Sequence, residues 1–204
     1  MTPSFSFAIV VSMYMNNKEK TTVNNDIVSS AVNIAHIAHR GQVDKQGGEY
    51  INHPLAVAKM LEIFGNRAYM AGALHDVVED SDYTAQDLLD YHIPCSVVRA
   101  VNAVSRPEDR SLSYMEWIRS IKNTSWEEDD FLSHQELENA GLNTDDSIPL
   151  AVIVKLADNY HNSLSSRSEN LPEGMKKRYF RARKVLEKDI PDNVIGILCS
   201  RIPA

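Results

Sequence analysis

The chain has 204 residues, of which 43% are hydrophobic and 24% charged, a composition that predicts one compact domain and excludes fibrous, mainly disordered and membrane-spanning proteins. Lys and Arg number 21 against 28 Asp and Glu, which gives a net charge of -7 and argues against nucleic acid as a partner, because this charge repels a polyanion. The 2 cysteines form no CxxC motif and support neither a disulfide scaffold nor a thiolate zinc site.

The N-terminal segment contains an apolar stretch from Phe5 to Met15. It is too short to span a bilayer, and no Lys or Arg precedes it as in a signal peptide. We therefore predict a tail over residues 1–24 and a single domain over residues 25–204, with a packed N-terminal strand as the alternative for the tail. We expect a cytoplasmic protein without a membrane partner, and the sequence leaves its oligomeric state open.

The first two helices are predicted between residues 27 and 65. Apolar residues at helical spacing indicate a helix from Ile27 that ends near Gly41. Pro54 suits the first position of the next helix, and Gly65 ends it. This places His53 just before the helix start, where we expect it to project from the helix entrance.

Further helical signals follow in order along the chain. A third helix is predicted from Arg67 to Asp80, and capping boxes at Thr84–Asp87 and Ser113–Glu116 each open another, with one between them that starts at Pro94. The last helices are predicted at residues 148–163 and 173–189. Strand signals are few, so the fold class is all-α, a helical bundle.

The segment 125–147 differs in composition, because it holds eight acidic residues and no Lys or Arg. Ser133 and Glu136 form a capping box, and Gly141 could end the short helix that it opens. We interpret the segment as an acidic inserted loop that is exposed to solvent. A lid over a functional site is the alternative.

Basic residues crowd the helix predicted at 173–189. They are Lys176, Lys177, Arg178, Arg181, Arg183, Lys184 and Lys188. We interpret this helix as solvated, with Tyr179 and Phe180 anchoring its other side to the bundle, and a nucleic-acid face is the alternative.

The clearest chemical feature is a group of polar residues in the otherwise apolar segment 71–80. His75 and Glu79 are four residues apart, as are Asp76 and Asp80, so each pair is predicted to share a helix face. Imidazole and carboxylate ligands suit a divalent ion with positions open for water and phosphate oxygen.

A second apolar helix places another acid in a buried environment. Asp158 follows a hydrophobic run, and Asn162 lies one turn later on the same face. An unpaired buried carboxylate is unfavourable, and one cation shared with the residues above would remove this penalty. The predicted metal ligands are His53, His75, Asp76 and Asp158.

Four segments together resemble the HD superfamily of metal-dependent phosphohydrolases. They are residues 38–45 (AHRGQVDK), 50–54 (YINHP), 74–80 (LHDVVED) and 155–158 (KLAD). Within that superfamily the chain is similar to the hydrolase domain of RelA/SpoT-type stringent-response enzymes and to the small alarmone hydrolases. The resemblance implies an all-α fold and Mn²⁺-dependent removal of the 3′-pyrophosphate from guanosine tetra- or pentaphosphate.

The resemblance also implies roles for individual residues. The four predicted ligands would hold Mn²⁺ or another divalent ion. Glu79 and Asp80 would be catalytic, since they would orient or deprotonate the attacking water and transfer protons at the leaving group. Lys45 would lie near the phosphates, and Asn162 would contact the nucleoside.

Two positions depart from the family pattern. Asp44 and Leu164 stand where the alarmone hydrolases usually have arginines, and a carboxylate cannot supply the guanidinium plane for a base. Two alternatives therefore stay open. One is an HD phosphohydrolase for a different small nucleotide, and the other is a catalytically inactive nucleotide sensor.

Overall fold

The computed structural model describes residues 25–107, 109, 111–164, 167 and 171–203, and all regular elements in these ranges are helices. In chain order they are α2 (Asn25–Ala38), α3 (Asn52–Leu61), η1 (Glu62–Phe64), α4 (Asn66–Leu74), α5 (Val77–Asp80), α6 (Ala85–Asp90), α7 (Cys95–Val104), α8 (Tyr114–Asn123), η2 (Glu128–Asp130), α9 (His134–Asn139), α10 (Leu150–Asn162), α12 (Glu173–Glu187) and α13 (Asp192–Ser200). The predicted all-α class is confirmed. The expected tail at residues 1–24 lies outside the described residues.

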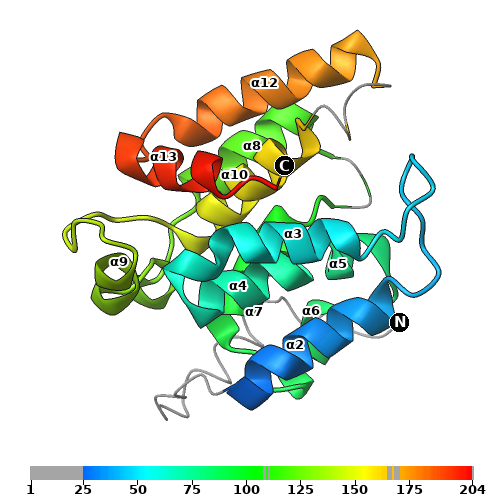
Figure 1. Cartoon of the computed structure of the whole chain (residues 1–204), viewed down its shortest axis with the longest axis horizontal. Helices are drawn as coiled ribbons and strands as arrows, with labels where there is room; N and C mark the ends of the chain where they lie inside the picture. Colours follow the sequence, from blue (N-terminus) through cyan, green and yellow to red (C-terminus); the bar gives the residue numbers. More distant parts are fainter. Residues whose placement is uncertain (1–24, 108, 110, 165–166, 168–170, 204) are drawn as a thin grey trace.

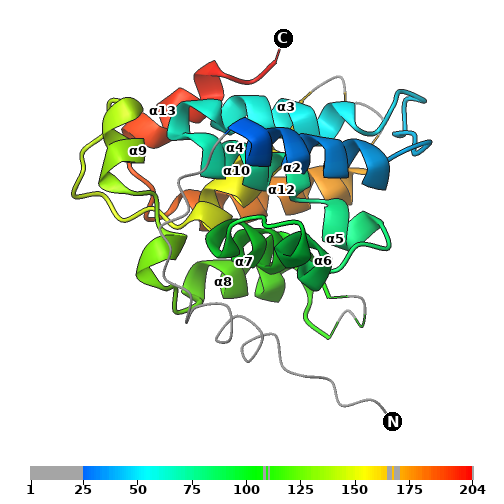
Figure 2. The same cartoon turned by 90° about the horizontal axis from the view of Figure 1, so that it is seen from below.

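Helix α10 lies at the centre of the bundle (Figure 1), where it packs against α3, α4, α7, α8 and α12. All its residues from Leu150 to His161 are buried. A helix that is buried all round must be apolar on nearly every face, which explains the run LAVIVKLA at its start. Figure 2 shows α2 crossing the opposite side of α4, so that α4 is also covered.

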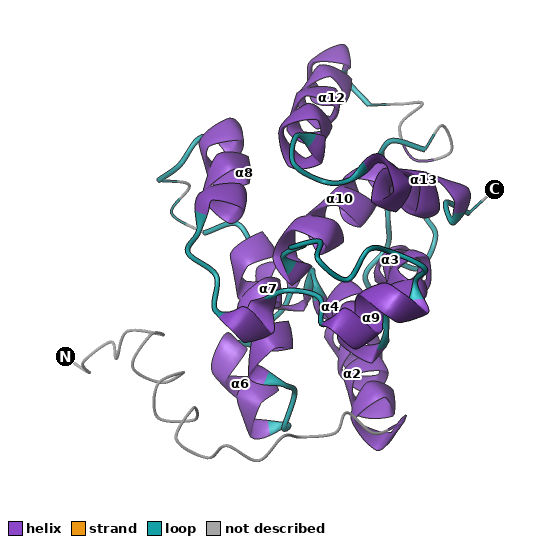
Figure 3. Cartoon of the chain, turned by 90° about the vertical axis from the view of Figure 1, so that its left-hand side faces the viewer, coloured by secondary structure: helices purple, strands orange, loops and turns teal. Residues whose placement is uncertain are grey.

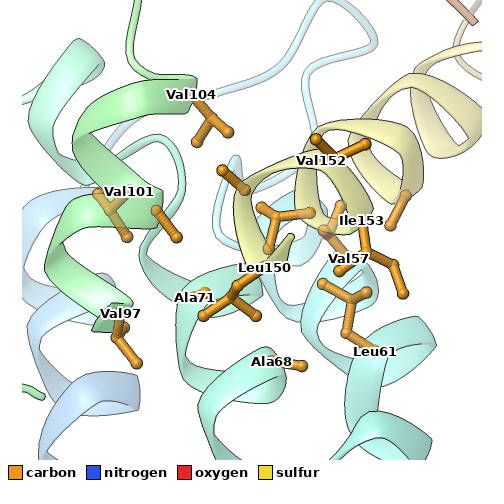
Figure 4. Close-up of a cluster of buried hydrophobic side chains, with 14 of the residues drawn as sticks. Val57, Leu61, Ala68, Ala71, Val97, Val101, Val104, Leu150, Val152 and Ile153 are labelled. Carbon is orange, nitrogen blue, oxygen red and sulfur yellow. The ribbon is translucent and has the colours of Figure 1, made fainter. Parts of the chain in front are cut away.

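The hydrophobic core joins α3, α4, α7 and α10. Figure 4 shows Val57, Ala68, Val101 and Ile153 in one cluster of side chains from these four helices, and each is fully buried. The arrangement fixes α3, the C-terminal end of α4 and α10 relative to one another. No described helix combines the length and the apolar composition that a bilayer crossing requires.

The predicted capping boxes are present. Thr84, Ser113 and Ser133 each accept a hydrogen bond from the amide three residues later, and the acidic side chain at that position accepts the amide of the cap. The short helices α6, α8 and α9 therefore begin where the sequence indicated.

The prediction of a single helix from Arg67 to Asp80 is wrong, because the structure has two helices there, α4 and α5, which are separated by His75 and Asp76. Nδ1 of His75 lies 2.7 Å from the carbonyl oxygen of Gly72. A carbonyl oxygen only accepts, so the imidazole donates, and a side chain thus binds a carbonyl within the last turn of α4.

The expected position of His53 before a helix is also wrong, because α3 begins at Asn52 and His53 lies in its first turn. Proline is tolerated in the first turn of a helix, where amides have no acceptor within the helix. Pro54 is therefore compatible with a helix that begins two residues before it, at Asn52. His53 is consequently buried, at 2% exposure, and does not project from the helix entrance.

The acidic segment 125–147 is attached to the bundle by two arginines. Arg67 of α4 binds both carboxylate oxygens of Glu136 and the carbonyls of Asp129 and Phe131. Arg99 of α7 donates to Asp130 at 2.6 Å. The leucines of the segment belong to the core, namely Leu132, Leu137 and Leu142.

Substitution of Arg67 by methionine is expected to destabilise the fold by about 3 kcal/mol, because it leaves the largely buried carboxylate of Glu136 without its cation. The measurement is urea unfolding at neutral pH. Lys59→Met is the matched control, since the ion pair of Lys59 with Glu62 is exposed and is worth about 0 to 1 kcal/mol. Equal losses in the two variants would contradict this account of the segment.

Candidate active site

Three buried side chains from different parts of the chain form a metal-ligand group. His53 of α3, His75 between α4 and α5, and Asp158 of α10 each offer one ligand atom, and these atoms lie within 4.8 Å of one another. Nε2 of His53 is 3.2 Å from Oδ1 of Asp158, and Nε2 of His75 is 3.6 Å from the same oxygen. Such a group could hold a metal ion.

Asp76, the fourth expected ligand, lies beside this group. Its Oδ2 is 3.4 Å from Nε2 of His53 and 3.2 Å from Nε2 of His75. The same oxygen accepts a hydrogen bond from the hydroxyl of Tyr50 at 2.6 Å. The structure thus brings together all four residues that the sequence indicated.

The residues fit a divalent cation, as the hydrogen bonds of His75 show. Because Nδ1 donates to Gly72, Nε2 is the nitrogen that carries the lone pair when the ring is neutral. Nε2 is buried and has no hydrogen-bond partner, although a buried polar atom without a partner is unfavourable. A metal ion with nitrogen and oxygen ligands would satisfy it, whereas the absence of a thiolate from the group argues against a structural zinc site.

The charge on Asp158 is stabilised by its neighbours. Burial alone would raise the pKa of this carboxyl group, but the Lys155 ammonium 2.7 Å from Oδ2 holds the pKa well below its usual range. The amide of Asn162 also donates to Oδ1. Asp158 is therefore an anion at neutral pH, as a metal ligand must be.

Glu79 and Asp80 follow on α5, close to the same group. Oε2 of Glu79 accepts a hydrogen bond from the backbone amide of Arg106 at 2.9 Å, and Oδ2 of Asp80 lies 3.2 Å from the hydroxyl oxygen of Tyr50. Burial is the main cause that raises the pKa of both carboxyl groups, and the charge of Asp76 adds to it. A raised pKa suits groups that exchange protons near neutral pH.

A cavity of about 250 Å³ opens at this point. The predicted site residues that line it are His53, Asp76, Glu79, Asp80, Asp158 and Asn162. His75 is fully buried beside them, and Lys45 is exposed in the loop before α3 and is not among the lining residues. None of the lining residues comes from segment 125–147.

Comparison with protein families identifies this arrangement. The HD domain model matches residues 50–163, more than half of the chain, and this range contains the four predicted ligands and both catalytic candidates. The chain belongs to the HD domain family. Its fold agrees, because a solved structure described as "A metazoan ortholog of SpoT hydrolyzes ppGpp and plays a role in starvation responses" superposes with a TM-score of 0.59 at 24% identity, over 88% of this chain and 96% of that one.

Curated relatives share parts of this HD domain. The zebrafish (Danio rerio) guanosine-3′,5′-bis(diphosphate) 3′-pyrophosphohydrolase MESH1 is 34% identical over 154 residues, which cover 72% of this chain and 73% of that protein. A GTP pyrophosphokinase of Streptomyces coelicolor is 29% identical over 164 residues, or 78% of this chain. This chain spans only 16% of the length of that kinase.

The HD domain site also contains residues to which the sequence analysis gave no role or a wrong one. Arg178 and Tyr179 of α12 line the cavity, as do Arg106 and Tyr114. The interpretation of α12 as solvated is therefore wrong for part of one face, and Phe180 is no anchor, since it is 53% exposed. The run of charges predicts a basic helix. Which of its residues face the cavity depends on how α12 packs over α8 and α10.

His161 is another such residue. Its Nδ1 lies 2.8 Å from Nδ1 of His53, and the two rings stack. Burial and the neighbouring His53 lower the pKa of His161 to about 3, so its ring stays neutral and can accept. If His53 donates through Nδ1, its Nε2 lone pair faces Asp76 and Asp158, as metal binding requires. The spacing of three residues from Asp158 was the available sequence signal.

Replacement of His161 by phenylalanine is expected to weaken metal binding about 10- to 100-fold, because His53 loses the partner that orients its ring and selects its tautomer. Isothermal titration with Mn²⁺ measures the effect. His134→Phe, an exposed histidine of α9, serves as control and should bind as the wild type does. Unchanged affinity in His161→Phe would show that the contact has no such role.

Proposed function

We propose that this HD domain hydrolyses guanosine 3′,5′-bis(diphosphate) at its 3′-pyrophosphate, with Mn²⁺ held by the four ligands. The observation that carries the proposal is that these ligands, Glu79 and Asp80 adjoin one cavity of about 250 Å³. The name of the zebrafish relative, which is 34% identical over 72% of this chain, states this activity. The proposal treats residues 25–204 as one catalytic domain that acts in the cytoplasm.

The ligand set supports metal-assisted hydrolysis without a covalent enzyme intermediate. A divalent ion at this site would supply Lewis-acid stabilisation of the phosphoryl oxygens and lower the pKa of water. Lys155 keeps Asp158 ionised, and Tyr50 positions Asp76 and Asp80 through its hydroxyl. These contacts fix the carboxylates before substrate binds, which lowers the reorganisation needed in the transition state.

Glu79 and Asp80 would transfer the protons. Water attacks the phosphorus next to the ribose 3′-oxygen, the P–O bond to that oxygen breaks, and the products are guanosine 5′-diphosphate and pyrophosphate. One carboxylate takes the proton of the attacking water, and the leaving 3′-oxygen gains a proton through the other. Their raised pKa values suit this exchange.

Asn162 and Lys45 would bind the rest of the nucleotide. Asn162 lines the cavity beside Asp158, and Oδ1 of its amide lies 3.3 Å from Nε of Arg167. Lys45 is exposed in the loop that leads to α3, so its charge is free to approach a phosphate from the solvent side.

The test is an assay of pyrophosphate release from guanosine 3′,5′-bis(diphosphate) by the purified protein with Mn²⁺, in comparison with the protein in EDTA. We expect release that depends on the metal. Metal-dependent hydrolysis of another nucleotide, without release from this one, would overturn the substrate and retain the chemistry. Absence of hydrolysis from any nucleotide would favour the inactive sensor.

A second candidate substrate class is favoured by Asp44. Its Oδ1 accepts the amides of Gln46 and Gly48, each at 2.9 Å, and its Oδ2 lies 3.8 Å from the Arg167 guanidinium. Asp44 thus shapes the loop that contains Lys45, and it offers a carboxylate where the alarmone hydrolases usually have an arginine. A nucleotide with a different base therefore belongs in the same assay.

A further inference from the structure

The cavity carries two positively charged side chains that the proposed chemistry does not use. Arg106 follows α7, and Arg178 lies on α12. They meet at Tyr114, the first residue of α8, because Cζ of Arg106 is 6.0 Å and Cζ of Arg178 is 4.6 Å from the centre of that ring. Figure 3 shows α8 and α12 beside α10 and away from α2.

Neither guanidinium has a carboxylate partner among the described residues. Nε of Arg106 and Nε of Arg178 are both buried without a hydrogen bond. Among the described residues, the one hydrogen bond of either guanidinium runs from Nη2 of Arg106 to the carbonyl oxygen of Leu112, at 2.8 Å. Buried polar groups are normally satisfied, so these nitrogens indicate a missing acceptor.

Three other cations that are buried or largely buried are paired with carboxylates. Arg67 binds Glu136, Arg99 binds Asp130, and Lys155 of the same cavity binds Asp158 at 2.7 Å. The chain carries a net charge of -7, so carboxylates are abundant, yet neither Arg106 nor Arg178 has one as a partner among the described residues. An anionic ligand would supply the acceptor that the fold does not.

We propose that Arg106 and Arg178 form an anion subsite that binds a second phosphate group of the substrate, the group that is not hydrolysed. The inference rests on the proposed function, in which the metal ligands hold the scissile group. Guanidinium groups bind phosphate oxygens through paired N–H donors, and the Tyr114 ring holds both groups by cation–π contact. The subsite therefore selects nucleotides with phosphates at two positions, here the 5′-diphosphate.

The kinetic test compares two substrates in the variants Arg106→Gln and Arg178→Gln. With guanosine 3′,5′-bis(diphosphate), each variant is expected to raise KM about 10- to 100-fold, the size of a lost charge-assisted hydrogen bond. With guanosine 3′-diphosphate, which lacks the 5′ group, KM should change less than about threefold. Equal losses with both substrates would overturn the assignment to the second phosphate.

The control variants separate charge from folding. Arg181→Gln removes an exposed charge from the same helix and should leave both KM values unchanged. Arg178→Lys keeps the charge without the paired donors and should recover part of the affinity. Thermal unfolding of every variant excludes a loss of structure as the cause of a kinetic change.

A binding measurement decides the proposal without hydrolysis. Titration of the Mn²⁺-loaded protein with guanosine 5′-diphosphate should show binding to the wild type and to Arg181→Gln, and binding about 10-fold weaker or more to both subsite variants. Equal binding to all four proteins, or no binding to the wild type, would overturn the subsite. Absence of pyrophosphate release, by contrast, would overturn only the proposed function.

Discussion

Substitution of Asp76 by asparagine is expected to lower metal-dependent hydrolysis about 1,000-fold or more, because the Lewis-acid contribution of a bound ion is several kcal/mol and each 1.4 kcal/mol corresponds to about tenfold in rate. The asparagine amide is nearly isosteric with the carboxylate and still offers an oxygen to the hydroxyl of Tyr50. In the wild type this hydroxyl donates to Oδ2 of Asp76 at 2.6 Å. The change therefore removes the negative charge between His53 and His75 with little other disturbance.

Two measurements check this expectation. Titration with Mn²⁺ should show weaker binding by Asp76→Asn, and the activity of the variant should remain far below wild type at moderate Mn²⁺. Asp82 is an exposed carboxylate two residues beyond the proposed catalytic residue Asp80, and Asp82→Asn should behave as wild type in both. Wild-type activity and Mn²⁺ affinity in Asp76→Asn would remove Asp76 from the ligand set.

Asp158 makes an instructive contrast, because it has two partners of different kinds. It faces the histidines through Oδ1 and pairs with the buried Lys155 through Oδ2. Its replacement by asparagine would therefore reduce both metal binding and stability, since it leaves Lys155 buried without its counter-charge. For this reason Asp76 is the cleaner position at which to test the metal site.

Much of the fold could be predicted from local signals. Capping boxes at Thr84, Ser113 and Ser133 depend on contacts three residues apart, so the sequence alone locates them. The break at His75 could not be predicted in this way, because it involves a side chain that binds the carbonyl of Gly72. Helix α13 was missed as well, and only Val194 and Leu198 of its nine residues are buried.

The candidate site likewise contains residues that the sequence could predict and residues that it could not. The four ligands could be proposed from their residue types and order, because acids and histidines in apolar helices need a common counter-charge. From the sequence alone, Arg106 and Arg178 could not be distinguished from basic residues at the protein surface. Their role depends on both reaching the ring of Tyr114 from different elements, and that is a property of helix packing.

Helix packing also makes Gly72 a sensitive position, and Gly72→Ala is expected to reduce stability by about 2 kcal/mol and to weaken Mn²⁺ binding. A Cβ at this position would lie 2.8 Å from Cα and 2.9 Å from the amide nitrogen of Ala58, closer than such contacts allow. Helices α3 and α4 must then separate, and overpacking of this kind costs about 1 to 3 kcal/mol. The strain exceeds the gain of about 0.5 to 1 kcal/mol that alanine normally brings to a helix.

The matched control is Gly196→Ala in α13, where a Cβ would meet no atom within 4 Å, so the helix gain should appear as a small stabilisation. The two helices that meet at Gly72 carry different proposed ligands, His53 on α3 and His75 at the end of α4. Their separation changes the distance between ligands, so the loss of Mn²⁺ affinity should accompany the loss of stability in urea. A destabilised variant with wild-type Mn²⁺ affinity would show that the metal site does not depend on the close contact of α3 and α4.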